Sequence, residues 1–129
     1  MKSPDLIYLL YATILCFVQV VVTAIGATQQ VGLNTLAGNR DNLPALEGWV
    51  GRSKRAHANM LENLILFAVL VLLAHVSGKA NATTALGATL FFWARLVYAG
   101  VYIAGVAWVR TVVWFISVIG LILIASQLL

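Results

Sequence analysis

Three polar side chains recur at helical spacing in an otherwise apolar stretch of the sequence. Arg55, Asn59 and Glu62 are separated by four and three positions, and residues at such steps lie on one stripe of an α-helix. A helix through this segment therefore presents a guanidinium, an amide and a carboxylate on one face. This combination of charged and hydrogen-bonding groups is suited to binding a small polar ligand.

A second polar stripe follows later in the chain. Arg95, Tyr98 and Tyr102 are separated by three and four positions, so they also share one face of a predicted helix. This stripe adds a second guanidinium and two phenols, which both donate and accept hydrogen bonds. Residues 77–80 are predicted to form a tight turn between the two helices, and counting outward from its centre gives pairs at equal membrane depth. The pairs are Glu62 with Arg95, Asn59 with Tyr98, and Arg55 with Tyr102.

The pairing of Glu62 with Arg95 has two interpretations. A charge at the bilayer centre costs at least ~2.5–3.5 kcal/mol, and such residues normally face a bundle interior and pair with one another. We therefore predict a Glu62–Arg95 ion pair, which by itself needs no role beyond joining two helices. The neighbouring polar residues favour a binding site for a small anionic ligand that arrives from the cytoplasm. These neighbours are Arg55, His57, Asn59, Asn63, Tyr98 and Tyr102.

The composition of the whole chain places these stripes in a membrane. Hydrophobic residues make up 62% of the 129 positions and charged residues 9%, and the mean hydropathy is +0.97. A soluble domain carries about 25% charged residues, so too few polar side chains are present to cover a water-facing surface. The net charge of +4 does not indicate nucleic-acid binding, because the basic residues flank apolar segments, as they do beside membrane spans.

We predict an all-α, integral membrane four-helix bundle that forms a single domain over residues 1–129. A spanning helix needs ~20 mostly apolar residues. Three apolar runs meet this length, whereas Leu64–Ala74 crosses only if its helix extends back through the first polar stripe. The first run is longer than the apolar region of a signal peptide, so it is predicted to be a retained helix. The predicted spans are residues 5–27, 46–77, 81–109 and 111–128.

The distribution of basic residues predicts the orientation. Most of the Lys and Arg residues lie in or just after the loop from Gly26 to Gly51, or at the helix junction marked by Arg110. With four spans these segments share one face, which the positive-inside rule assigns to the cytoplasm, with both termini outside. A metal site is not predicted, because the chain has one cysteine, and His57 and His75 fall near opposite ends of one span.

Several of these segments resemble those of a known family of membrane proteins. Residues 55–63 (Arg-Ala-His-Ala-Asn-Met-Leu-Glu-Asn) are similar to the second-helix signature of the MAPEG family, the membrane-associated proteins in eicosanoid and glutathione metabolism. Residues 94–98, with Tyr102 and Arg110, resemble the signature of its third helix and the arginine that follows. Residues 38–41 (Gly-Asn-Arg-Asp) are most similar to small bacterial members. The resemblance covers the whole chain and implies a location in the bacterial inner membrane.

The resemblance also implies a ligand, an assembly and a chemistry. The family's known members are homotrimers that bind glutathione between subunits near the cytoplasmic face. They act as glutathione transferases, glutathione peroxidases or eicosanoid synthases on lipophilic substrates, so glutathione is the expected co-substrate here, in detoxification. Arg110 corresponds to the arginine that stabilises the glutathione thiolate, because a guanidinium lowers the pKa of a nearby thiol and the thiolate is the nucleophile. The glutathione-binding residues implied are Arg55, His57, Asn59, Glu62, Tyr98 and Tyr102.

The chain departs from the better-known enzymes of the family at two places. It has Thr28-Gln29-Gln30 where those enzymes have a basic residue, so a glutathione carboxylate would find amides there instead of a cation. The separation of Tyr102 and Arg110 is one residue shorter than in several of those enzymes. Two other function classes remain open, a MAPEG-fold protein without catalysis and a small four-helix transporter. Transporters of that kind rely on a glutamate in their first helix, which this chain lacks.

Overall fold

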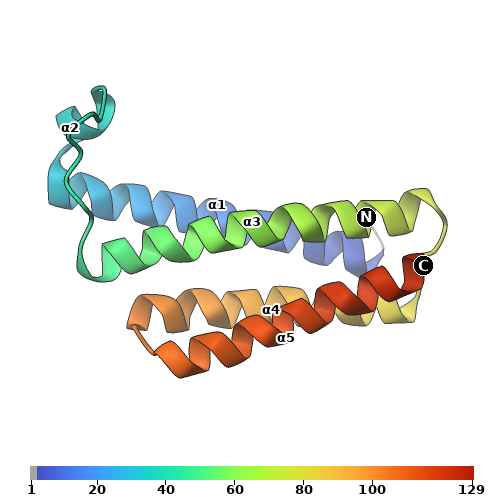
Figure 1. Cartoon of the computed structure of the whole chain (residues 1–129). Coiled ribbons are helices and arrows are strands. Elements are labelled where there is room, and N and C mark those ends of the chain that lie inside the picture. Colours follow the sequence, from blue (N-terminus) through green and yellow to red (C-terminus); the bar gives the residue numbers. More distant parts are fainter. Residues whose placement is uncertain (1–2) are drawn as a thin grey trace.

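A computed structural model describes residues 3–129 and consists of helices joined by turns and one long loop (Figure 1). The first two residues of the predicted domain lie outside this description. All helices except the short α2 are long and apolar enough to cross a membrane. The predicted all-α fold with four apolar helices is confirmed, and the chain is a multi-pass membrane protein. In chain order the helices are α1 (Pro4–Val31), α2 (Leu33–Ala37), α3 (Gly48–Val76), α4 (Ala82–Ala104) and α5 (Ala107–Leu128).

The four long helices lie side by side, with α1 next to α3 and α4 next to α5 (Figure 1). Helices α3 and α4 each pack against all of the other three long helices, so together they form the centre of the bundle. The α1–α3 loop and the α4–α5 junction lie at one end, which we call the loop end. The start of α1, the end of α5 and the α3–α4 turn lie at the opposite end, which we call the terminal end (Figure 1).

Two helix ends carry the signals that stop or start a helix. Asn81 caps α4 in a capping box, because its side chain accepts from the backbone of Thr84 while the Thr84 hydroxyl accepts from the Asn81 backbone. Helix α4 ends at Ala104, five residues before the expected end of the third span. The reason is Gly105, whose φ of 84° lies in the left-handed region that glycine adopts without strain.

The apolar core depends on close packing between helices. Phe67 of α3 and Phe91 of α4 are fully buried, and their stacked rings have centroids 4.1 Å apart. Helices α4 and α5 approach most closely where Gly87 faces Gly120. A Cβ atom on either glycine would lie 2.5 Å from the carbonyl oxygen of the other, so only glycine fits at this crossing. Such small-residue contacts are the usual means of close helix packing in membranes.

A buried carboxylate joins three helices at the terminal end. Asp5 of α1 is 1% exposed, and its Oδ1 lies 2.8 Å from Nε2 of His75 on α3. The hydroxyl of Thr84 on α4 donates to Oδ2 at 3.2 Å, and the Ser3 hydroxyl also donates to the carboxylate. Every acceptor oxygen of this side chain is therefore in use, as a buried charged group requires.

Asp5→Ala is expected to lower the free energy of unfolding by about 1–3 kcal/mol, because His75 and Thr84 lose a shared acceptor in a buried position. Asp41→Ala is the matched control, since that aspartate is exposed in the loop. Denaturant unfolding in detergent micelles measures both variants. Equal stability of the two would show that the Asp5 contacts contribute nothing to the bundle.

Candidate functional site

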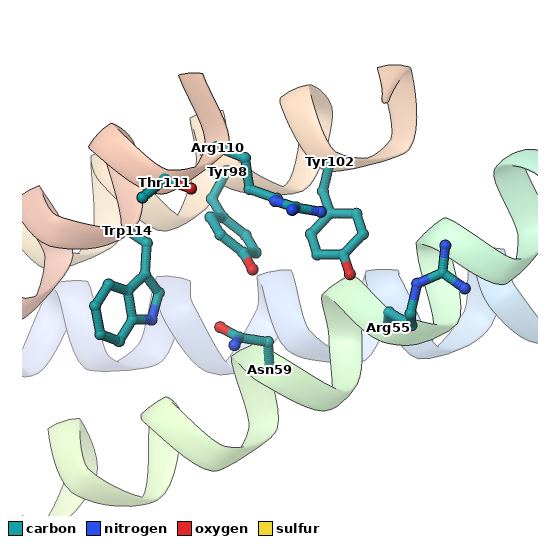
Figure 2. Close-up of a pocket in the computed structure, with 7 residues that line it drawn as sticks. All are labelled: Arg55, Asn59, Tyr98, Tyr102, Arg110, Thr111 and Trp114. Carbon is teal, nitrogen blue, oxygen red and sulfur yellow. The ribbon is translucent and has the colours of Figure 1, made fainter. Parts of the chain in front are cut away.

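A pocket of about 300 Å³ opens at the loop end of the bundle, between α3 on one side and α4 and α5 on the other (Figure 2). Helix α3 supplies one basic side chain and one amide, α4 supplies two phenols, and α5 supplies a second basic side chain, a hydroxyl and an indole. The lining residues are Arg55, Asn59, Tyr98, Tyr102, Arg110, Thr111 and Trp114. The pocket therefore combines residues from both predicted polar stripes with residues from the last helix.

The reversal of the chain at Gly105 brings α5 back over the end of α4. Its effect is to set the guanidinium of Arg110 against the ring of Tyr102, with 4.5 Å between Cζ and the ring centroid. A cation over an aromatic face is held electrostatically. Arg110 is thus restrained at the wall of the pocket, next to the phenols, where Figure 2 shows it directed between Tyr98 and Tyr102.

Arg95 lies behind the pocket wall and orients two of its lining residues. Its side chain is 1% exposed. Nη2 donates to Oδ1 of Asn59 at 2.8 Å, and the guanidinium carbon lies 4.2 Å from the centroid of the Tyr98 ring. Among the described residues Nε and Nη1 have no hydrogen-bond partner. Asn59 is therefore the one hydrogen-bonding partner that residues 3–129 offer to a deeply buried charge.

The ion pair predicted between Glu62 and Arg95 is not formed within the described chain. Arg95 bonds to Asn59 instead, and Glu62 is exposed. Successive residues of a helix turn by about 100°, so Glu62 falls about 60° to one side of Asn59, whereas Asn63 falls about 40° to the other. The buried face of α3 includes Met60 and Asn63, so Glu62 turns away from α4. Spacing of three or four positions groups residues that differ by up to about 100° around the helix, so it could not show that Glu62 and Asn63 point in different directions.

His57 also lies apart from the pocket. Two helical positions from Arg55 correspond to a rotation of about 200°, which directs the histidine to a different side of α3, and it is half-buried there. Sequence reasoning missed Thr111 and Trp114 as lining residues. The signal was available, because Trp114 follows Arg110 by four positions and so shares its helix face.

The glutamines at the end of α1 do not both remain free for a ligand. The amide of Gln30 donates to the Glu47 carbonyl at 2.8 Å, and its oxygen accepts from the Glu47 backbone N–H at 3.0 Å. These two bonds join the start of the long loop to its end. Gln30 therefore closes the loop, and Gln29, which is exposed, is the amide left to act as a donor at this end of α1.

The charges of the lining residues favour an anion. Two guanidiniums face the cavity from opposite sides, Arg55 from α3 and Arg110 from α5, and the lining includes no acidic side chain. The phenols and Asn59 supply directional hydrogen bonds, whereas the indole of Trp114 supplies an apolar wall. A small ligand whose carboxylates meet the guanidiniums and whose apolar part rests on the indole fits such a lining.

The amino-acid sequence was compared with known proteins. It matches the MAPEG family over residues 6–129, which is nearly the whole chain. Neither a curated protein nor a solved structure shows a significant match.

Replacement of Asn59 tests its contact with Arg95. Asn59→Leu is expected to lower the free energy of unfolding by about 3 kcal/mol, because a buried charge loses its hydrogen-bond acceptor. Asn59→Asp is the matched variant. It should lower the free energy of unfolding by less, because its carboxylate gives Arg95 a counter-charge at the same place. Unfolding in detergent micelles measures both, and equal losses would contradict the contact.

Proposed function

The chain belongs to the MAPEG family, and from this membership we propose that it is a glutathione-dependent membrane enzyme. The proposed activity is that of a transferase or peroxidase acting on lipophilic electrophiles or hydroperoxides. The observation that carries the proposal is the pocket at the loop end, where two guanidiniums and two phenols surround a cavity of about 300 Å³ without an acidic residue in its lining. That volume is at the lower end of the range for small-molecule sites, about 300–1,000 Å³.

Glutathione has two carboxylates, one ammonium group and a thiol, and the lining offers a partner for most of them. We assign one carboxylate to Arg55, since charge-assisted hydrogen bonds to carboxylates are the strong ones. Asn59, Tyr98 and Tyr102 would bond to the peptide groups. Glu62 lies outside the pocket of the single chain, so in this proposal it contributes to binding from a subunit interface.

Arg110 is the proposed catalytic residue. Its guanidinium would stabilise the sulfur as a thiolate, because a nearby positive charge lowers the pKa of a thiol. In a transferase the thiolate forms a C–S bond and the leaving group departs with the bonding electrons. In a peroxidase the sulfur attacks the peroxide, the alcohol leaves after protonation, and a second glutathione condenses with the sulfenic acid to give a disulfide and water.

The proposed assembly is a homotrimer with the glutathione sites at the subunit contacts. Arg55 and Glu62 support it, because both are exposed on α3 in the single chain. A charged side chain facing lipid costs at least ~2.5–3.5 kcal/mol near the bilayer centre, so protein is the favoured cover for this face. The loop end is proposed to face the cytoplasm, since it holds most of the basic residues.

Arginine substitutions test ligand binding and catalysis separately. Arg55→Ala should weaken glutathione binding about tenfold or more, the effect of one charge-assisted hydrogen bond. Arg110→Ala should abolish most turnover with a lipophilic electrophile while the protein stays folded. Arg40→Ala is the control, because that arginine is exposed in the loop and its side chain donates to the Leu36 carbonyl.

Binding is measured by calorimetry on the detergent-solubilised protein, and turnover by product formation with a panel of electrophiles and hydroperoxides. Wild type that does not bind millimolar glutathione would contradict the proposal as a whole. Binding without any turnover would favour a catalytically silent member of the family. Full turnover in Arg110→Ala would rule out its assigned role.

The subunit number is a separate prediction. Native mass spectrometry in mild detergent should give three copies, and Glu62→Leu should weaken glutathione binding if the side chain reaches the ligand across an interface. If the protein is a monomer in mild detergent and still binds glutathione, the trimeric site is contradicted.

A further inference from the structure

An arginine outside the pocket bonds to the end of α4. Helix α4 leaves its last four carbonyls without helical partners, as every helix does. The Val101 and Tyr102 carbonyls accept from the backbone N–H groups of the turn at Gly105. The Ile103 carbonyl accepts instead from Nε of Arg52, at 2.8 Å.

This bond spans the two sides of the pocket. Arg52 lies three positions before Arg55 on α3, one helical turn away on a neighbouring line. Ile103 directly follows Tyr102 on α4. The contact therefore fixes the position of α3 relative to α4 at the mouth of the pocket, next to two of its lining residues.

The short α4–α5 junction couples the bond between Arg52 and Ile103 to the position of Arg110. Chain reversal between α4 and α5 takes only the two residues from Gly105 to Val106. The first turn of α5 then carries Arg110, whose backbone N–H bonds to the Val106 carbonyl. Anything that holds the end of α4 in place therefore also places the start of α5 and its guanidinium.

We propose that Arg52 is a positioning residue for the reaction, because its bond to the Ile103 carbonyl holds the α4–α5 junction against α3. The Arg110 guanidinium and the α3 side of the pocket are thereby kept at a working separation. This inference rests on the proposed function. It adds a residue that touches neither glutathione nor the second substrate.

The local chemistry explains why an arginine is placed there. A cation near a helix C-terminus interacts favourably with the helix dipole, and its N–H group satisfies a free carbonyl. The side chain also lies along Gly105, since a Cβ built at that position would meet Nε of Arg52 at 3.5 Å and its Cδ and Cζ at 3.7 Å, ordinary van der Waals distances. Arg52 thus packs across the open side of the turn as well as bonding to it.

The experiment compares Arg52→Met with Lys54→Met in the full-length protein in detergent. Both variants remove one positive charge from the same end of α3, but Lys54 is exposed and makes no hydrogen bond among those described. Arg52→Lys keeps the charge and a donor. Should Arg52→Met fail to fold, Arg52→Gln, which keeps an amide donor, takes its place. Hydrogen–deuterium exchange of the backbone over residues 103–110 reports the junction, and steady-state kinetics report kcat and KM for glutathione.

Arg52→Met is expected to increase exchange over residues 103–110 and to lower kcat by about 100-fold, the cost of a misplacement of about 1 Å at a reacting group. KM for glutathione should change less, and Arg52→Lys should restore part of both effects. Lys54→Met should match wild type in exchange and in kcat.

Two results would overturn the inference. One is exchange in Arg52→Met that equals that of Lys54→Met, which means that the bond does not hold the junction. The other is a looser junction with unchanged kcat, which means that the junction does not place the reacting groups. If wild type shows no glutathione-dependent turnover, the proposed function fails, and the exchange comparison alone decides whether Arg52 anchors the junction.

Discussion

The burial of one guanidinium in an apolar helix bundle is the constraint on which the site depends. Arg95 lies on α4, one of the two central helices, and is fully enclosed, and a charge in that position requires polar neighbours. Asn59 gives it a hydrogen bond and Tyr98 gives it an aromatic face. The same two residues line the pocket. The contacts that stabilise the buried charge therefore also fix the shape of the cavity.

The two ends of the bundle are built differently. At the terminal end Asp5 joins α1, α3 and α4, and the capping box of Asn81 fixes the start of α4. At the loop end the described side-chain hydrogen bonds between helices α3 and α4 are those of Arg52 and Arg95. The pocket lies between these two contacts. Further side-chain bonds at this end tie α1 to α3 and to the loop, namely those of Thr23 with Ser53 and of Gln30 with the Glu47 backbone.

Much of the fold could be predicted from the sequence because lipid imposes strong rules. Length and apolar content identify four helices. The end of α4 was missed, because the predicted span ran to residue 109, past Gly105, whose left-handed backbone ends the helix. The site was predicted less completely. Spacing placed Arg55 and Asn59 on the correct helix face but could not exclude Glu62 or His57, because helix rotation relative to α4 is set by packing of residues such as Phe67 and Phe91. Contacts between distant segments, such as Arg52 with Ile103, have no local signal at all.

The exposed charges of α3 bear on the proposed assembly. Within the described residues, Arg55 and Glu62 make no ion pair, although both lie on a helix with the length and hydropathy of a membrane span. If lipid covered Glu62, which lies at the middle of α3, the helix would carry an unpaired charge against hydrocarbon, at a cost of at least ~2.5–3.5 kcal/mol. If a second copy covers Arg55 and Glu62, each charge can meet an opposite charge, a ligand carboxylate or the ligand ammonium. Glu62 thus carries the energetic argument for assembly, whereas Arg55, together with Arg110, carries the argument for an anionic ligand at the loop end.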